Sequence, residues 1–405
     1  MVLNLNKDVV RALNYRNYRL YFAGQSISQI GTWMQRTGVS WLIYTTTHSA
    51  FMLGVSAFAS QFPAFLFSLY AGIISDRYNR HQVVLITQTA SMIQAFLLAL
   101  LVLSGNYRVW EILALSAVLG VTNAFDVPVR APMVHEMITD KADLSNAIAL
   151  NSSMNNLARL VGPALSGIIL TKWGAGFCFL LNAFSFVAVI GSLLLMNLPP
   201  YIPVKKERHL FRELGEGFTY LKKTPALGKV ILMLAIMSLL VIPYSTLLPV
   251  FAKVIFKGDA ETFGYINSFI GVGALCGAWF LASLKPGADH RKILFVNTIV
   301  LGIGLVLFSQ IGYFPLAMGM AVLCGFGTMS QTSVSNIIIQ TESDPAMRGR
   351  TMSYLTTAVY GMLPLGALLI GAVSKRIGAT GSLLVEGVLA LLVVSLFSGS
   401  LLKKK

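Results

Sequence analysis

The chain has 405 residues, of which 55% are apolar and only 12% are charged, and its mean hydropathy is +0.71. Soluble domains carry about 25% charged residues, so this composition excludes an ordinary soluble fold. The net charge of +15 needs its own explanation, because a basic chain also suits nucleic acid.

Apolar runs of about 20 residues recur along the whole chain, and each is long enough to cross a bilayer as a helix. The sequence therefore predicts an all-α membrane protein with about twelve transmembrane helices. The predicted spans are 19–46, 51–75, 82–104, 108–137, 147–171, 175–197, 228–256, 261–284, 292–312, 315–340, 352–374 and 380–402. The first residues lack a separate signal region, so we expect the first span to direct its own insertion.

Lysine and arginine are distributed unequally between the two sides of the predicted spans. An even number of spans places both termini on one side, and 22 of the 31 basic residues fall there. Six fall on the other side: Arg108, Lys172, Lys253, Lys257, Lys375 and Arg376. The positive-inside rule therefore predicts cytoplasmic termini in a bacterial inner membrane. Since this asymmetry explains the net charge, no nucleic-acid partner is expected.

The turn between the second and third spans concentrates charge. It reads "GIISDRYNRH" and holds four titratable residues, Asp76, Arg77, Arg80 and His81. Gly72 permits close helix approach, and Asp76 is expected to face the positive N-terminus of a neighbouring helix. We expect Arg80 to reach Glu136, at the end of the fourth span, in an ion pair that breaks when the protein opens inward. The alternative is a turn held by lipid headgroups alone.

Charged residues inside spans are the main candidates for a functional site, because burying charge in hydrocarbon costs several kcal/mol. They are Arg36, Asp126, Arg130, Arg159 and Glu386. Asp126 and Arg130 lie one turn apart, with Pro128 between them, and so share a helix face. Asp126 is a candidate for proton uptake, with a static Asp126–Arg130 pair as the alternative. The three arginines favour an anionic ligand over a cationic one.

The longest connection, 198–227, is predicted to be a cytoplasmic linker between a bundle at 1–197 and a bundle at 228–405. Within it, Leu210, Leu214, Phe218 and Leu221 fall on one helical face. This pattern is typical of an amphipathic helix that lies on the cytoplasmic leaflet.

Uncharged polar residues in the spans are weaker candidates for the lining of a cavity. They are Gln29, Asn155, Tyr244, Gln331 and Asn336. Each is better explained by hydrogen bonds between helices than by a substrate contact. In the seventh span, Pro243 and Pro249 are expected to break the helix near Tyr244. The three cysteines share no metal or redox spacing, so neither a metal nor another cofactor is expected.

The two halves repeat with an offset of 204 residues. Gly162, Gly167, Gly174 and Ala175 match Gly366, Gly371, Gly378 and Ala379, and Asp140 matches Asp344. Parallel repeats of six spans are typical of transporters built from two bundles that rock about a central site.

Two motifs support a family assignment. The turn "GIISDRYNRH" resembles the signature of the major facilitator superfamily: Gly72, Asp76, Arg77 and Arg80 match, while Asn79 and His81 replace a glycine and a basic residue. "RLVGPALSG", with Gly162 and Pro163, is similar to the motif of its exporters, although glycine packing alone also explains it. The segments "NAFDVPVRAPMVHEM" and "MRGRTMSYLTTAVYGMLPLGALL" resemble its drug and siderophore exporters, related to the enterobactin exporter and the macrolide efflux pumps.

The resemblance implies a major facilitator fold of about twelve transmembrane helices in two pseudo-symmetric six-helix bundles. It implies a monomeric proton-coupled antiporter, driven by the proton gradient, that exports a small amphiphile. The buried arginines make an anionic, siderophore-like substrate the first expectation. The alternatives are multidrug or macrolide efflux and lysophospholipid transport. Neither an enzyme nor a sensor is expected, because the sequence carries no catalytic motif and no large loop domain.

Overall fold

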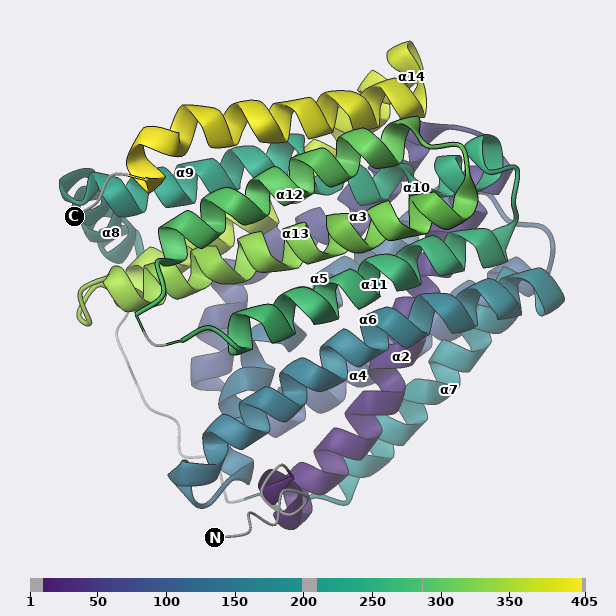
Figure 1. The fold of residues 1–405 in the computed structure, drawn as a ribbon. Helices are drawn as coiled ribbons and strands as arrows, with labels where there is room; N and C mark the ends of the chain where they lie inside the picture. Colours follow the sequence, from purple (N-terminus) through teal and green to yellow (C-terminus); the bar gives the residue numbers. More distant parts are fainter. Residues whose placement is uncertain (1–9, 199–209, 286, 403–405) are drawn as a thin grey trace, which may run out of the picture. The chain divides into compact units, whose positions relative to one another are not determined.

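The computed structural model describes residues 10–198, 210–285 and 287–402, without the side chains at 68, 69, 72, 73, 75, 76, 131, 210–214 and 400. These residues are almost entirely helical, and no strand occurs among them (Figure 1). The longer helices are α2 (Arg16–Thr47), α3 (Ala50–Arg77), α4 (Arg80–Leu103), α5 (Val109–Met137), α6 (Leu144–Trp173), α7 (Ala175–Leu194), α8 (Leu210–Lys223), α9 (Pro225–Leu240), α11 (Ala260–Ala282), α12 (His290–Gln310), α13 (Phe314–Glu342) and α14 (Arg348–Leu401). The short elements are η1 (Arg11–Asn14), η2 (Lys141–Asp143), η3 (Ile242–Leu247), α10 (Leu248–Val250) and η4 (Phe251–Ile255).

Eight helical segments of the described chain are long and apolar enough to cross a membrane. Three further helices, α2, α6 and α13, have 32, 30 and 29 residues but carry more polar side chains. The 54-residue α14 contains a non-helical residue, Gly378, and so covers two of the predicted spans. Each predicted span therefore overlaps a described helix, and the all-α membrane fold is confirmed.

The chain divides into two compact units. Unit 1 comprises Met1–Leu42 and Pro63–Lys206, and unit 2 comprises Ile43–Phe62 and Glu207–Lys405. The segment 43–62 packs within unit 2 because glycines permit close contact there. A Cβ on Gly54 of α3 would collide with the Ala367 carbonyl of α14, and a Cβ on Gly371 would lie 2.8 Å from the Ala50 carbonyl.

Two glycines turn the chain at corresponding points of the repeat. Gly174, between α6 and α7, has φ 83° and ψ 176°, and Gly378, inside α14, has φ 76° and ψ 168°. Residues with a side chain are essentially excluded from this backbone region. The two positions are 204 residues apart, so the repeat in the sequence is also a repeat in backbone conformation.

Each unit has its own pattern of helix packing. In unit 1, α4 packs against both α5 and α7, and α6 packs against α7. In unit 2, α12 lies between α13 and the C-terminal part of α14, and α13 packs against α11 on its other side (Figure 1). These three-helix contacts give each unit an interior in which polar side chains are removed from lipid.

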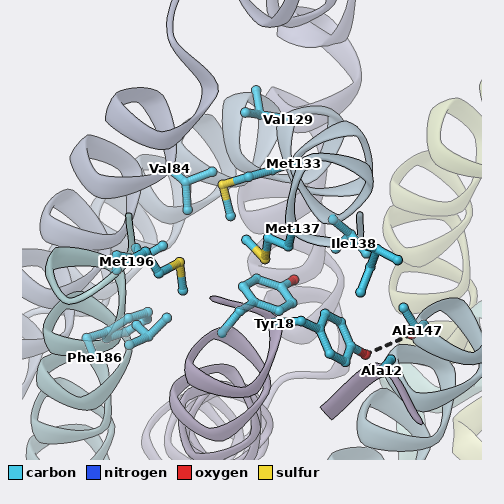
Figure 2. Packing of buried hydrophobic residues seen from close by; sticks show 14 of the residues in the cluster. Ala12, Tyr18, Val84, Val129, Met133, Met137, Ile138, Ala147, Phe186 and Met196 are labelled. Carbon is cyan, nitrogen blue, oxygen red and sulfur yellow. Dashed lines mark hydrogen bonds between the residues drawn. The ribbon is translucent and has the colours of Figure 1, made fainter. Parts of the chain in front are cut away.

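A buried apolar cluster of unit 1 draws its residues mainly from α2, α4, α5, α6 and α7 (Figure 2). Tyr18 of α2 is fully buried in this cluster, which also contains Met133 and Met137 of α5. Its hydroxyl donates a hydrogen bond of 2.8 Å to the Ala147 carbonyl of α6. The phenol thus fills the apolar cluster while its polar tip is satisfied, which fixes the start of α2 against α6.

The predicted amphipathic helix is present as α8 and is attached to the start of α14. Glu216 pairs with Arg350 at 2.7 Å, and the Tyr220 hydroxyl accepts a hydrogen bond of 3.0 Å from the Asp344 backbone N–H. Phe218 stacks on Tyr354 with ring centroids 6.4 Å apart. Two of its predicted apolar residues, Leu210 and Leu214, lie outside the described side chains, and its position on the leaflet stays a prediction.

The seventh predicted span is broken, as its two prolines predict. The α-helix α9 ends at Leu240, and the 3-10 helix η3 contains Pro243 and Tyr244. The chain then continues through α10, which contains Pro249, into the π-helical turn η4.

Candidate functional site

Asp126 of α5 lies at the centre of a polar network in unit 1. Its Oδ1 accepts hydrogen bonds from Thr87 Oγ1 at 2.7 Å and from Gln88 Nε2 at 2.9 Å, both on α4. Its Oδ2 accepts from Arg130 Nε, one turn along α5. Because both oxygens have donors, the ionised carboxylate is stabilised although the residue is only 4% exposed. This geometry supports the static-pair interpretation of Asp126.

Arg130 is held on a second side by α2. Tyr21, itself buried, lies beside the guanidinium. One guanidinium nitrogen, Nη1, is buried with no hydrogen-bond partner among the described residues. The pair with Asp126 therefore leaves one donor of Arg130 unused.

Two arginines of unit 1 lie over the same indole ring. The Arg36 Cζ is 5.1 Å from the centroid of Trp33, and the Arg159 Cζ is 5.7 Å from it. Arg36 and Trp33 are one turn apart on α2, whereas Arg159 comes from α6. Both distances lie within the range of cation–π contact. No ion pair of Arg159 occurs in the described part of the chain.

Gly162, the glycine of the predicted exporter motif, lies against Trp33 and Ile30 of α2. A Cβ on Gly162 of α6 would approach the Trp33 Cβ to 2.5 Å and the Ile30 carbonyl to 3.0 Å. Gly162 therefore brings α6 against α2 at the height of Trp33, three residues from Arg159. The neighbouring Pro163 is also buried within α6. The close contact at Gly162 thus brings Arg159 of α6 to Trp33 of α2.

The predicted pair of Arg80 and Glu136 is present in unit 1, with Nη1 and Oε1 2.5 Å apart. Arg77 is exposed at the last residue of α3, and the side-chain placements of Gly72 and Asp76 lie outside what the structure describes. The role of this turn as a gate stays a prediction.

A corresponding pair occurs in unit 2, between Arg291 of α12 and Glu342 of α13. Arg291 Nε and Nη2 bind the two Glu342 oxygens at 3.2 and 2.5 Å. Both side chains are partly buried, and the pair is bidentate.

Glu386 of α14 differs from every other acidic residue above. It is 1% exposed, and both carboxylate oxygens are buried without a hydrogen-bond partner in the described chain. It belongs to unit 2, whereas the network of Asp126 belongs to unit 1. Of the other predicted charges, Asp126 pairs with Arg130, and Arg36 and Arg159 both lie over Trp33.

The uncharged candidates are dispersed. Asn155 and Asn336 each donate to a backbone carbonyl four residues earlier in their own helices, at 3.0 and 3.2 Å. Tyr244 and Gln331 are buried, Gln29 is half-buried, and the Gln331 Oε1 has no described partner. Only Asn155 is exposed, on the same helix as Arg159.

Several functional partners were not predicted from the sequence. Thr87 and Gln88 stand out only as adjacent polar residues in the apolar run of α4, a signal that would have identified them. Trp33 has no such signal, because its role depends on the approach of α6.

A separate buried network also joins three helices: Gln35 donates to Gln94 at 3.0 Å, and Asn182 donates to Gln35 at 2.7 Å.

Comparison with known proteins gives a family match over almost the whole chain. Residues 10–404 match the family model described as transmembrane secretion effector, of the major facilitator group. The matched region includes both units and every candidate residue named above.

Three characterised relatives are similar over nearly their full length. The staphyloferrin A transporter of Staphylococcus aureus is 24% identical over 383 residues, which are 94% of this chain and 95% of that protein. Macrolide efflux protein A of Streptococcus pyogenes is 20% identical over 396 residues, 94% of this chain and 95% of the relative. The enterobactin exporter EntS of Shigella flexneri is 24% identical over 400 residues, 93% and 91% respectively.

Solved structures support the fold. The crystal structure of a D-xylose-proton symporter aligns with a TM-score of 0.74 at 12% sequence identity, covering 95% of this chain and 97% of that one. At this identity the similarity concerns the fold alone.

Proposed function

The chain belongs to the transmembrane secretion effector family of major facilitator transporters, and on this premise we propose that it exports a small anionic amphiphile, such as a siderophore, in exchange for protons. The family consists of transporters rather than enzymes, and the protein is a multi-pass membrane protein. The basic residues on the side of the termini support a cytoplasmic position for both ends.

One observation carries the choice of an anion: Arg36 and Arg159 both lie over Trp33. Two guanidinium groups beside one ring repel each other, and an anion between them would remove that repulsion. Guanidinium forms two parallel hydrogen bonds with a carboxylate or phosphate group, and catecholate oxygens offer similar acceptors. The indole adds an apolar surface for the rest of an amphiphilic molecule.

The siderophore class is also supported by two relatives. Their names state that they transport staphyloferrin A and export enterobactin. Sequence identity of 24% does not transfer a particular siderophore to this chain, so the proposal concerns the class of anion only.

The test is a binding titration with matched anionic, neutral and cationic ligands, using purified protein. Arg36→Gln and Arg159→Gln should each weaken the anion about tenfold, equivalent to about 1.4 kcal/mol, because one guanidinium contact is lost. Binding of the neutral analogue should change little. Arg376→Gln is the matched control, because Arg376 is an exposed arginine of α14 and is not one of the two arginines over Trp33.

Macrolide efflux is the second candidate, and the similarity to macrolide efflux protein A favours it. A macrolide bears an amine, so it would meet the same arginines with the wrong sign of charge. Tighter binding of the cationic ligand than of the anionic one, unaffected by Arg36→Gln and Arg159→Gln, would contradict anion export and favour this candidate.

A further inference from the structure

Glu386 is a buried carboxyl group with no described partner. It lies eight residues beyond the Gly378 corner, in the C-terminal part of α14, and is 1% exposed. Neither Oε1 nor Oε2 accepts or donates a hydrogen bond in the described chain. Most buried polar groups in proteins are hydrogen-bonded, so an orphan carboxyl group requires an explanation.

The packing around Glu386 is tight. A Cβ on the next residue, Gly387, would lie 2.8 Å from the backbone nitrogen of Val306 and 2.9 Å from the Gly302 carbonyl, both on α12. A Cβ on Gly304 of α12 would in turn meet the sulfur of Cys324 at 3.2 Å. Glu386 is therefore buried next to a close contact between α12 and α14, with Cys324 of α13 nearby.

No described cation compensates the carboxyl group. Cys324 of α13 is the titratable group that lies near it. The basic residues of α12 lie at the start of that helix, where Arg291 pairs with Glu342 of α13. Lys375 and Arg376 are exposed on the other side of the Gly378 corner.

The contrast with Asp126 is informative. The Asp126 carboxylate has three side-chain donors, one of them a guanidinium, and so is held as an anion. An ionised Glu386 would have none, and a buried charge without a partner costs several kcal/mol. A neutral carboxylic acid avoids that cost at this position.

We propose that Glu386 is the proton-binding site of unit 2: it holds a proton in the conformation described here and releases it when α12 and α14 separate. In that step the carboxylic O–H bond breaks, the proton passes to an entering water molecule, and the carboxylate remains. This inference rests on the proposed exchange of substrate for protons. It assigns the proton to Glu386 and leaves Asp126 a structural anion.

The protonation state is tested directly by infrared difference spectroscopy of the purified protein. A protonated carboxyl group has its own carbonyl band, which is absent from a carboxylate. The wild type should show this band at pH 7, and Glu386→Gln should abolish it. Glu261→Gln, which alters a carboxylate hydrogen-bonded to Tyr265, should leave it intact. A band that persists in Glu386→Gln would overturn the assignment, whatever the substrate is.

The role in coupling is tested by flux in proteoliposomes. Glu386→Gln should lose accumulation of substrate against a gradient and keep downhill exchange, because the neutral amide cannot release a proton. Retained proton-driven accumulation would overturn the proposal. If Glu386→Gln fails to fold, Glu386→Asp should shift the pH midpoint of accumulation, and an unchanged profile would overturn it. If wild-type flux needs no proton gradient, the proposed exchange of substrate for protons is wrong. The infrared band reports the protonation of Glu386 independently of flux, so it separates this failure from a wrong assignment of the proton site.

Discussion

The ion pairs Arg80–Glu136 and Arg291–Glu342 should contribute unequally to stability, although they occupy corresponding places in the two halves. The first joins one nitrogen to one oxygen, with the side chains 23% and 30% exposed. The second joins two nitrogens to two oxygens, with the side chains 14% and 26% exposed. Exposed pairs contribute about 0.2–1 kcal/mol, and bonds to charged groups contribute about 1.5–3 kcal/mol.

We therefore expect a coupling energy of about 0.5–1 kcal/mol for Arg80–Glu136 and about 1–2 kcal/mol for Arg291–Glu342. The assay is a double-mutant cycle, with both residues of each pair changed to alanine singly and together and with thermal or denaturant unfolding followed in detergent. Raising the salt concentration should weaken the first coupling more, because it is more exposed. A coupling at Arg80–Glu136 equal to or larger than that at Arg291–Glu342 would refute the reasoning.

Three further experiments test the structure. Gly378→Ala should destabilise the protein by about 1–3 kcal/mol, because a side chain at φ 76° strains the backbone. As the control, Gly319→Ala within a helix should stabilise the protein by about 0.5–1 kcal/mol in the same unfolding assay. Asp126→Asn should cost about 3–5 kcal/mol by leaving Arg130 uncompensated, and adding Arg130→Met should recover most of it; no recovery would argue against a static pair. Glu216→Ala should increase protease cleavage near α8 without changing ligand affinity, and unchanged cleavage would argue against the attachment of α8 to α14.

Features that depend on local sequence could be predicted. The helices follow from hydropathy, the Asp126–Arg130 contact from one-turn spacing, and the correspondence of Gly174 with Gly378 from the repeat. In each case the relevant residues lie within a few positions of one another or share a fixed offset.

Features that depend on packing between distant segments could not be predicted. Trp33 meets Arg159 only because Gly162 lets α6 approach α2. The Arg291–Glu342 pair was not identified because loops of different length break the 204-residue offset there: Glu342 lies 206 residues after Glu136. The isolation of Glu386 likewise depends on which face of α14 meets α12.

The glycine corners also have a mechanical consequence. Because a single residue joins the two helices at each corner, the helices can rotate about the glycine but cannot move apart along their axes. A displacement of the first part of α14 along its axis must therefore also displace the second part. Such a displacement would move Glu386 past the close glycine contacts of α12. The corner would thereby couple a movement at one end of the helix pair to exposure of a carboxyl group at the other.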